Sequence, residues 1–368
     1  MKRLLVCVVI VIIAYSTREF WFEPAKKALA SSVDSIQEWS GDTTFDLSFE
    51  FVDDFLRAVL PVEEQPEEEA IAVEAPAPDL VNPEDTFFSV HNIELGDTRQ
   101  EVEEEVGEPE RVTVNEYGLE WYAYHSDYQN FFMVSYDEND LAKGLYTNQD
   151  LLASESGITY GTEQQVVREQ LGEPIDVLRK GLFSYKLNEE EAYDLFELED
   201  SYVTIFYDEH RDLTVTGIQI MDHDIEQDKR SLYADQDEAL RDGFEYQLFD
   251  VMNAERVAHG LPILLWAEDV RYTARKHSAD MAEKRYFDHT NLEGQSPYDR
   301  MEADGIRFRT AGENLAMGQF SSIYAHEGLM NSIGHREAIL NAQFENVGIG
   351  VAFGEEGQPF FTEKFYTR

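Results

Sequence analysis

The sequence predicts an α+β protein with two folded domains that follow an N-terminal export segment. Three observations indicate this fold class: an internal repeat in which a helix precedes strands, two C-terminal helices followed by strand-like runs, and a Pro-, Glu- and Ala-rich segment before both. A chain of 368 residues with 43% hydrophobic residues is long enough to form two cores of ordinary size.

Residues 1–22 are typical of an export signal. Lys2 and Arg3 precede an apolar run over residues 4–15, which is shorter than the roughly 20 residues that a spanning helix needs. No clear small-residue cleavage motif follows the run, so both a cleaved signal peptide and a short uncleaved membrane anchor remain open. We expect the rest of the chain to be extracytoplasmic, either secreted or attached to the cell membrane by its N-terminus.

The formal net charge of −46 is concentrated in the first two thirds of the chain. Residues 245–368 carry a net charge of −7, which leaves −39 on residues 1–244. Such a surface repels nucleic acid and anionic lipid headgroups, so neither is expected as a partner. The charge favours solubility in saline or alkaline surroundings, with a cationic partner as the alternative. The only cysteine, Cys7, lies in the signal, so no internal disulfide is expected outside it.

Residues 23–84 are predicted to be an acidic helical segment followed by a linker. Phe51, Phe55 and Val59 recur at helical spacing, and the Pro-, Glu- and Ala-rich stretch begins at residue 63. That stretch cannot bury enough apolar surface to fold, which places a domain boundary near residue 85.

Residues 85–225 contain an internal repeat with a constant offset of 65 residues. GDTRQEVEEEVGEP begins at Gly96 and GTEQQVVREQLGEP begins at Gly161. In each copy a polar cap (Asp97 or Thr98 in the first, Thr162 in the second) starts a helix that ends at Gly-Glu-Pro. Strand-like runs follow each copy, at residues 119–124, 131–136, 202–207 and 214–221. The repeat predicts an α+β domain and indicates no chemistry.

Residues 245–368 form the second predicted domain. One apolar helix face precedes Gly260, and a second helix is expected over about residues 269–284. The run NVGIGVAF at residues 346–353 predicts a strand that another backbone approaches closely, because glycines alternate with branched residues. FFTEKFYT at residues 360–367 predicts its partner strand.

Four segments carry a resemblance to a known family. They are YFDHTN (286–291), AGENLA (311–316), NSIGHREAIL (331–340) and NVGIGVAF (346–353). In this order they resemble the CAP superfamily of cysteine-rich secretory and pathogenesis-related (SCP-like) proteins, which implies a three-layer α-β-α sandwich. The repeat domain in turn resembles the CAP-associated domain of YlbC-type bacterial proteins, so a bacterial source is expected.

The resemblance also implies a polar cleft with two histidines and two acids. Its motifs place His289, Glu313 and His335 at three of these positions. The fourth position does not transfer cleanly, since alignment through Leu329 puts Ser332 there, and Glu327 is the nearest acid.

Two roles are open for His289, Glu313 and His335. Two imidazoles and a carboxylate could hold a divalent metal such as zinc with an open coordination position. They could equally form a hydrogen-bond network that orders three loops. We expect the three side chains to converge within one coordination sphere or one short network.

The sequence favours a binding role over catalysis. An extracellular peptide, lipid or cell-wall component is the expected ligand of the cleft. A metal-assisted hydrolase using the same cleft is the alternative, and a scaffold that docks a partner through the acidic repeat domain is a second one. No committed nucleophile is present, because Ser332 is expected to cap the following helix with its hydroxyl. HEGLM at residues 326–330 lacks the second histidine of a metalloprotease motif.

Overall fold

The computed structural model describes residues 75–180, 183–187, 192–198 and 200–368. The predicted signal segment, the acidic helical segment and most of the linker lie outside these ranges. Within them, no helix is both long and apolar enough to cross a membrane.

The N-terminal half of the described chain is an α+β domain, here called the repeat domain. Its sheet has seven antiparallel strands in the order β2-β3-β4-β5-β11-β10-β9. The elements are β1 (Phe88–Val90), α4 (Arg99–Val106), β2 (Arg111–Val114), β3 (Glu120–Ser126), β4 (Gln129–Tyr136), β5 (Ala142–Thr147), β6 (Leu152–Ser154), α5 (Gln164–Leu171), β7 (Val177–Lys180), β8 (Phe183–Lys186), β9 (Tyr193–Glu197), β10 (Ser201–Asp208), β11 (Thr214–Asp222) and α6 (His223–Asp228).

The two predicted repeat helices are present as α4 and α5. Thr98 caps α4 and forms a capping box with Glu101, as local chemistry predicts. The cap of α5 is Glu163 rather than Thr162, and it makes no side-chain cap hydrogen bond. Each helix ends at a glycine with φ near 90°, a conformation that side chains with a Cβ rarely adopt. The four predicted strand runs correspond to β3, β4, β10 and β11.

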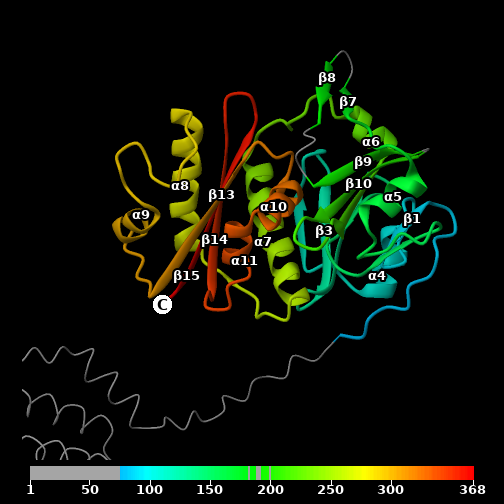
Figure 1. The fold of residues 1–368 in the computed structure, drawn as a ribbon, viewed down its shortest axis with the longest axis horizontal. Helices are drawn as coiled ribbons and strands as arrows, with labels where there is room; N and C mark the ends of the chain where they lie inside the picture. Colours follow the sequence, from blue (N-terminus) through cyan, green and yellow to red (C-terminus); the bar gives the residue numbers. More distant parts are fainter. Residues whose placement is uncertain (1–74, 181–182, 188–191, 199) are drawn as a thin grey trace, which may run out of the picture. The chain divides into compact units, whose positions relative to one another are not determined.

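The C-terminal half is a three-layer sandwich, as expected. Its sheet has the order β12-β14-β15-β13, with β13 at one edge. Figure 1 shows α8 on one side of this sheet and α7, α10 and α11 on the other. The elements are α7 (Glu238–Ala258), β12 (Leu265–Trp266), α8 (Glu268–Lys284), α9 (Pro297–Ala303), β13 (Thr310–Met317), α10 (Ser322–Asn331), α11 (Ile333–Ile339), β14 (Asn346–Phe353) and β15 (Pro359–Thr367).

The glycines of β14 permit the close approach of α8 that the sequence indicates. A Cβ on Gly350 would lie 2.0 Å from the backbone nitrogen of Arg275, and one on Gly348 would lie 2.2 Å from that of Arg271. Because real Cβ atoms do not approach backbone so closely, the helix could not pack at this distance on a strand with side chains there.

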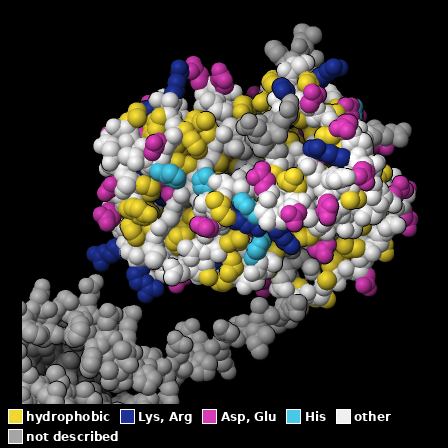
Figure 2. Space-filling model, in the orientation of Figure 1, with side chains coloured by type: hydrophobic (Ala, Val, Ile, Leu, Met, Phe, Trp, Pro, Cys, Tyr) yellow, Lys and Arg dark blue, Asp and Glu magenta, His cyan; other side chains and the backbone are white. Residues whose placement is uncertain are grey.

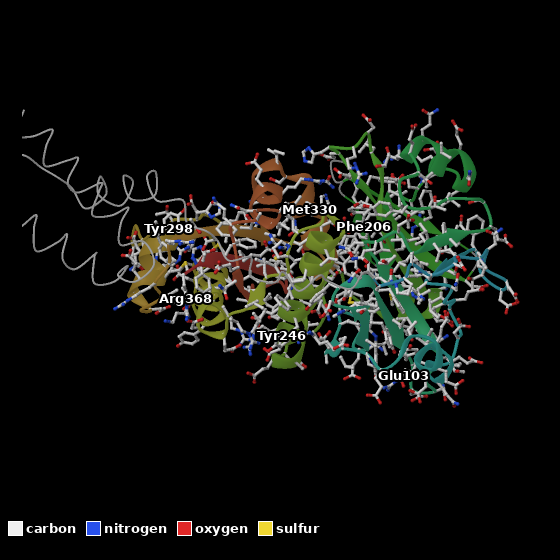
Figure 3. The ribbon with its side chains drawn as sticks, turned by 90° about the horizontal axis from the view of Figure 1, so that it is seen from below. Glu103, Phe206, Tyr246, Tyr298, Met330 and Arg368 are labelled. Carbon is white, nitrogen blue, oxygen red and sulfur yellow. The ribbon has the colours of Figure 1, made fainter. Side chains whose placement is uncertain are left out.

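Helix α7 packs between the two sheets, and one hydrophobic cluster runs through both domains. The cluster joins Phe131 and Phe206 of the repeat sheet to Leu248 of α7 and Met330 of α10. Figure 3 shows Phe206 and Met330 close together where the two domains meet. Polar contacts also cross this boundary, since Arg111 Nε lies 2.8 Å from Asp250 Oδ2. The linker-like polar residues 222–242 predict that the two domains fold independently. The shared core argues against that prediction.

Candidate functional site

The carboxylate of Glu313 is the centre of the polar cluster that the sequence motifs indicate. Its side chain is only 1% exposed, on edge strand β13. Oε1 accepts hydrogen bonds from His289 Nδ1 and Arg300 Nη2, both at 3.0 Å. Oε2 accepts from Arg300 Nη2 at 2.9 Å and from Lys364 Nζ at 2.5 Å. Both oxygens of this buried carboxylate are therefore occupied by donors of the same chain.

The surroundings of Glu313 keep it ionised. Burial acts to raise its pKa, but the His289 hydrogen bond and the charges of Lys364 and Arg300 outweigh it and lower the pKa from 4.5 to about 2. Lys364 is fully buried on β15, where it is the register partner of Glu313. A buried cation so placed needs an anion, so Glu313 and Lys364 stabilise each other.

His289 is held by its backbone and by one ring nitrogen. Arg300 Nη1 donates to the His289 carbonyl oxygen at 2.8 Å, and the ring contacts Glu313 through Nδ1. Because an ionised carboxylate can only accept, Nδ1 carries the proton in this hydrogen bond. The side chain of His289 is 49% exposed, which leaves Nε2 as the atom that a ligand can reach.

His335 lies in the first turns of α11 and is half-buried. Its carbonyl oxygen accepts a hydrogen bond from Asn314 Nδ2 at 3.1 Å. Burial is the main cause that lowers the pKa of its imidazole, and His289 contributes in the same direction. The lowered pKa favours the neutral form of the His335 imidazole near neutral pH.

Of the three expected residues, His289 and Glu313 are joined by a hydrogen bond, whereas the ring of His335 makes none to either of them among the described residues. Among the described residues, no group of three His, Cys, Asp or Glu side chains is arranged to hold a metal ion. Glu313 has no oxygen left for a metal, and two adjacent cations would repel one. The trio of His289, Glu313 and His335 does not fit a resident zinc.

The two candidates for the fourth position are not part of this network. Glu327 on α10 points toward the repeat sheet, where Tyr146 Oη donates to its Oε1 at 3.0 Å. Burial raises the pKa of Glu327 to about 8. Ser332 is exposed and caps both α10 and α11, but its hydroxyl makes no cap hydrogen bond, contrary to expectation. Its backbone serves both helices, while the hydroxyl remains available.

Sequence reasoning missed several charged residues of the site. Arg300 and Lys364 bind Glu313 from α9 and β15, and alternation along the FFTEKFYT strand places Lys364 on the face of Thr362. His277 of α8 is 1% exposed and its Nε2 lies 3.1 Å from the Asp288 carbonyl oxygen. His277 follows the buried Val270 by seven residues, which is two helical turns, so helical periodicity would have placed His277 on the buried face of α8.

Three exposed apolar side chains lie close to the two histidines along the chain. Phe287 is 45% exposed, Leu292 is 63% exposed and Ile333 is 59% exposed. Each lies within three residues of His289 or His335 along the chain. Figure 2 shows histidine and hydrophobic side chains next to one another on one face of the protein. Exposed apolar residues thus stand near each histidine in the sequence.

Comparisons with known families and proteins agree with this architecture. Residues 95–232 match the family described as CAP-associated N-terminal, and residues 249–365 match the cysteine-rich secretory protein (CAP) family. The chain is 26% identical to the uncharacterized membrane protein YlbC of Bacillus subtilis (strain 168) over 291 residues, which cover 74% of this chain and 82% of YlbC. It is 39% identical to the uncharacterized protein YkwD of the same strain over 122 residues, which cover 33% of this chain and 46% of YkwD.

Two solved structures share the arrangement of both domains. An extracellular protein with an SCP domain from Bacillus anthracis is 25% identical, with a TM-score of 0.64 over 80% of this chain and 100% of that one. A cysteine-rich secretory protein from Staphylococcus aureus is 14% identical, with a TM-score of 0.59 over 78% of this chain and 95% of that one, and shows the fold alone. The chain therefore carries a CAP domain preceded by a CAP-associated N-terminal domain.

Proposed function

We propose that the chain is an extracytoplasmic CAP-domain protein of the bacterial cell surface whose cleft binds an extended peptide through His289 and His335. The observation that carries this proposal is that the Glu313 carboxylate fixes the orientation of the His289 ring while the other side of the ring stays exposed. The buried carboxylate fixes the ring through Nδ1, while the half-exposed ring offers Nε2 to a ligand. A preoriented imidazole loses little conformational freedom when it binds.

The place of the cleft in the sheet supports an extended ligand. Strand β13, which carries Glu313, lies at the sheet edge, and no strand of the described ranges pairs with its outer side. An extended peptide can add to such an edge through backbone hydrogen bonds. The exposed side chains of Phe287, Leu292 and Ile333 would then contact its apolar residues.

An extracytoplasmic location is supported by the N-terminal sequence and by the relatives. Lys2 and Arg3 before an apolar run are typical of export. YlbC is named a membrane protein, and the Bacillus anthracis protein is named extracellular. The ligand would accordingly be a peptide of the cell surface.

A hydrolase is the second candidate, because a carboxylate that orients a histidine through Nδ1 is also how many hydrolases hold their general base. That role would need a nucleophile or a bound water near His289 Nε2. None of the described hydrogen bonds joins Nε2 to a hydroxyl or thiol. Binding therefore needs only the groups already described, whereas hydrolysis would also need a nucleophile or bound water near His289.

The test uses the purified full chain and immobilised peptides of random sequence, with phospholipid vesicles and peptide-free wall glycan as the other probes. We expect retention on peptides, and a roughly tenfold or greater loss in the His289→Ala and Ile333→Asp variants. His223→Ala, which removes a histidine of the repeat domain, is the matched control. Retention on vesicles or glycan alone would contradict the proposal, and cleaved peptides detected by mass spectrometry would favour the hydrolase.

A further inference from the structure

A second polar region lies where the repeat sheet meets α10 of the CAP domain. It contains a cavity of about 30 Å³, lined by β10 and β11 on one side and by Phe320 and Tyr324 on the other. Thr204 Oγ1 and Tyr324 Oη lie 2.8 Å apart and connect the two sides. A water-sized group needs about 10–15 Å³, so the cavity has room for one or two such groups.

Buried acceptors without partners face this cavity. Glu116 is 2% exposed, and neither of its carboxylate oxygens has a hydrogen-bond partner of normal geometry among the described residues. Gln219 is also 2% exposed, and its Oε1 lacks a partner within the same ranges. Buried polar atoms in proteins are nearly always paired, so these acceptors indicate a missing donor.

The other walls of the cavity suit a positively charged donor. Rings of Tyr117, Tyr202, Tyr324 and Phe320 line it. An ammonium group is already present at one wall, since Lys229 Nζ lies 5.0 Å from the centroid of the Tyr117 ring. Carboxylates combined with aromatic faces are the surroundings that bind ammonium groups in proteins.

The second acid of the cavity is already neutralised. Glu226 is ion-paired with the buried Lys180 and accepts a hydrogen bond from Tyr117 Oη at 2.7 Å. Lys229, the Glu116 backbone and the Ser321 hydroxyl favour the charged form of Glu116, but none of them makes a hydrogen bond of normal geometry to its carboxylate oxygens within the described residues. Glu116 is therefore the carboxylate that can take a further cation.

We propose that this cavity binds the ammonium group of a primary amine, with Glu116 as its carboxylate partner. The ammonium head has the size of the cavity, and its three N–H donors match the unpaired oxygens of Glu116 and Gln219. Lys229 is partly exposed, so the rest of the amine leaves on the side where Lys229 reaches solvent. This site is separate from the cleft at His289 and does not depend on the function proposed for that cleft.

Two sources of the ammonium group are possible, a free amine or a lysine side chain of another protein. Calorimetric titration of the full chain with butylammonium chloride and with Nα-acetyl-lysine-N-methylamide distinguishes them. A free-amine site binds both probes, whereas a site for lysine side chains favours the second. Butanol and the Nε-acetylated lysine derivative are neutral controls, and KCl keeps the ionic strength constant.

Three variants test the role of the named residues. Glu116→Gln should weaken binding of the amine about ten- to a hundredfold, because this is the loss of affinity expected when a hydrogen bond to a charged group is removed. Glu110→Gln removes an exposed acid just before β2 and should leave the affinity for amines unchanged. Lys229→Met removes the competing ammonium of the chain and should strengthen binding. Since burial raises the pKa of Glu116, binding should weaken as the pH falls and this carboxylate is protonated.

Several outcomes would overturn the proposal. One is the absence of saturable binding in both the wild type and Lys229→Met. A second is equal binding by the wild type and Glu116→Gln, or binding of the neutral controls. If only Lys229→Met binds amines, Lys229 is the native occupant of the cavity and no external ligand uses it. Lys229→Met keeps the test decisive if Glu116→Gln does not fold.

Discussion

Replacing Glu313 by glutamine tests whether this carboxylate stabilises the buried charge network that it forms with Arg300 and Lys364. Glutamine has the same shape but no charge, so Arg300 and the fully buried Lys364 lose their shared anion. The lowering of the Glu313 pKa from 4.5 to about 2 corresponds to about 3 kcal/mol in favour of the ionised form. Removing one member of a buried ion pair costs about 3–5 kcal/mol, so we expect a loss of that size in the free energy of unfolding.

Urea unfolding of the full chain at neutral pH, followed by tryptophan fluorescence, measures this loss. Glu293→Gln is the matched control, because it removes an exposed pair with Lys284 and should cost less than about 1 kcal/mol. The contribution of Glu313 is present above its unfolded pKa and is lost as the pH falls through about 2, so the difference between wild type and Glu313→Gln should shrink in acid. A loss below about 1 kcal/mol in the free energy of unfolding at neutral pH would show that Glu313 does not stabilise Arg300 and Lys364 as described. A difference between wild type and variant that does not change in acid would show the same.

Three further predictions follow from the shared core and the buried groups. Burial raises the pKa of Glu255 to about 7 and those of Glu327 and Glu363 to about 8, so the stability they contribute below about pH 4.5 should be lost as the pH rises through 7–8. Urea titrations at several pH values should show this fall, and Glu327→Gln should reduce its slope by about one proton; an unchanged slope would count against it. The fragment 245–368 alone should bind the dye ANS and unfold without cooperativity, because its α7 face is covered by the repeat sheet; a cooperative transition would show independent folding. Gly350→Ala should cost about 3 kcal/mol or more, whereas Gly334→Ala, with open space around it, should be nearly neutral; similar costs would disprove the close packing of α8 on β14.

Local patterns in the sequence predicted about half of the helices and strands that the structure describes. The cap at Thr98, the glycines after α4 and α5, and the alternating glycines of β14 each act within a few residues, so their meaning can be read from the chain itself. The packing of α7 between two sheets could not be predicted in the same way. Whether an apolar helix face covers one sheet or two depends on which distant strands reach it.

In the candidate site, too, the local motifs could be recognised in the sequence but the contacts between distant segments could not. The motifs located His289 and Glu313, and the structure joins them by a hydrogen bond. The cations were missed because an isolated Arg or Lys in a sequence usually lies at the surface, and only the register between β13 and β15 puts Lys364 opposite Glu313. The direction of the Glu327 side chain could not be predicted, because helix α10 has several faces. Its contact with Tyr146 of the repeat sheet shows that Glu327 lies on the face turned toward that sheet.

The central claim is that Glu313 orients His289 as an anchored imidazole rather than as a metal ligand. Long-range ¹H–¹⁵N NMR spectra of the full chain at pH 8, with and without one equivalent of zinc, report the protonation of both ring nitrogens of His289. We expect a proton on Nδ1, an unprotonated Nε2, loss of this preference in Glu313→Gln, and no stoichiometric zinc binding at the ring. An unprotonated Nδ1, or a zinc-bound ring whose metal is lost in Glu313→Gln, would contradict it.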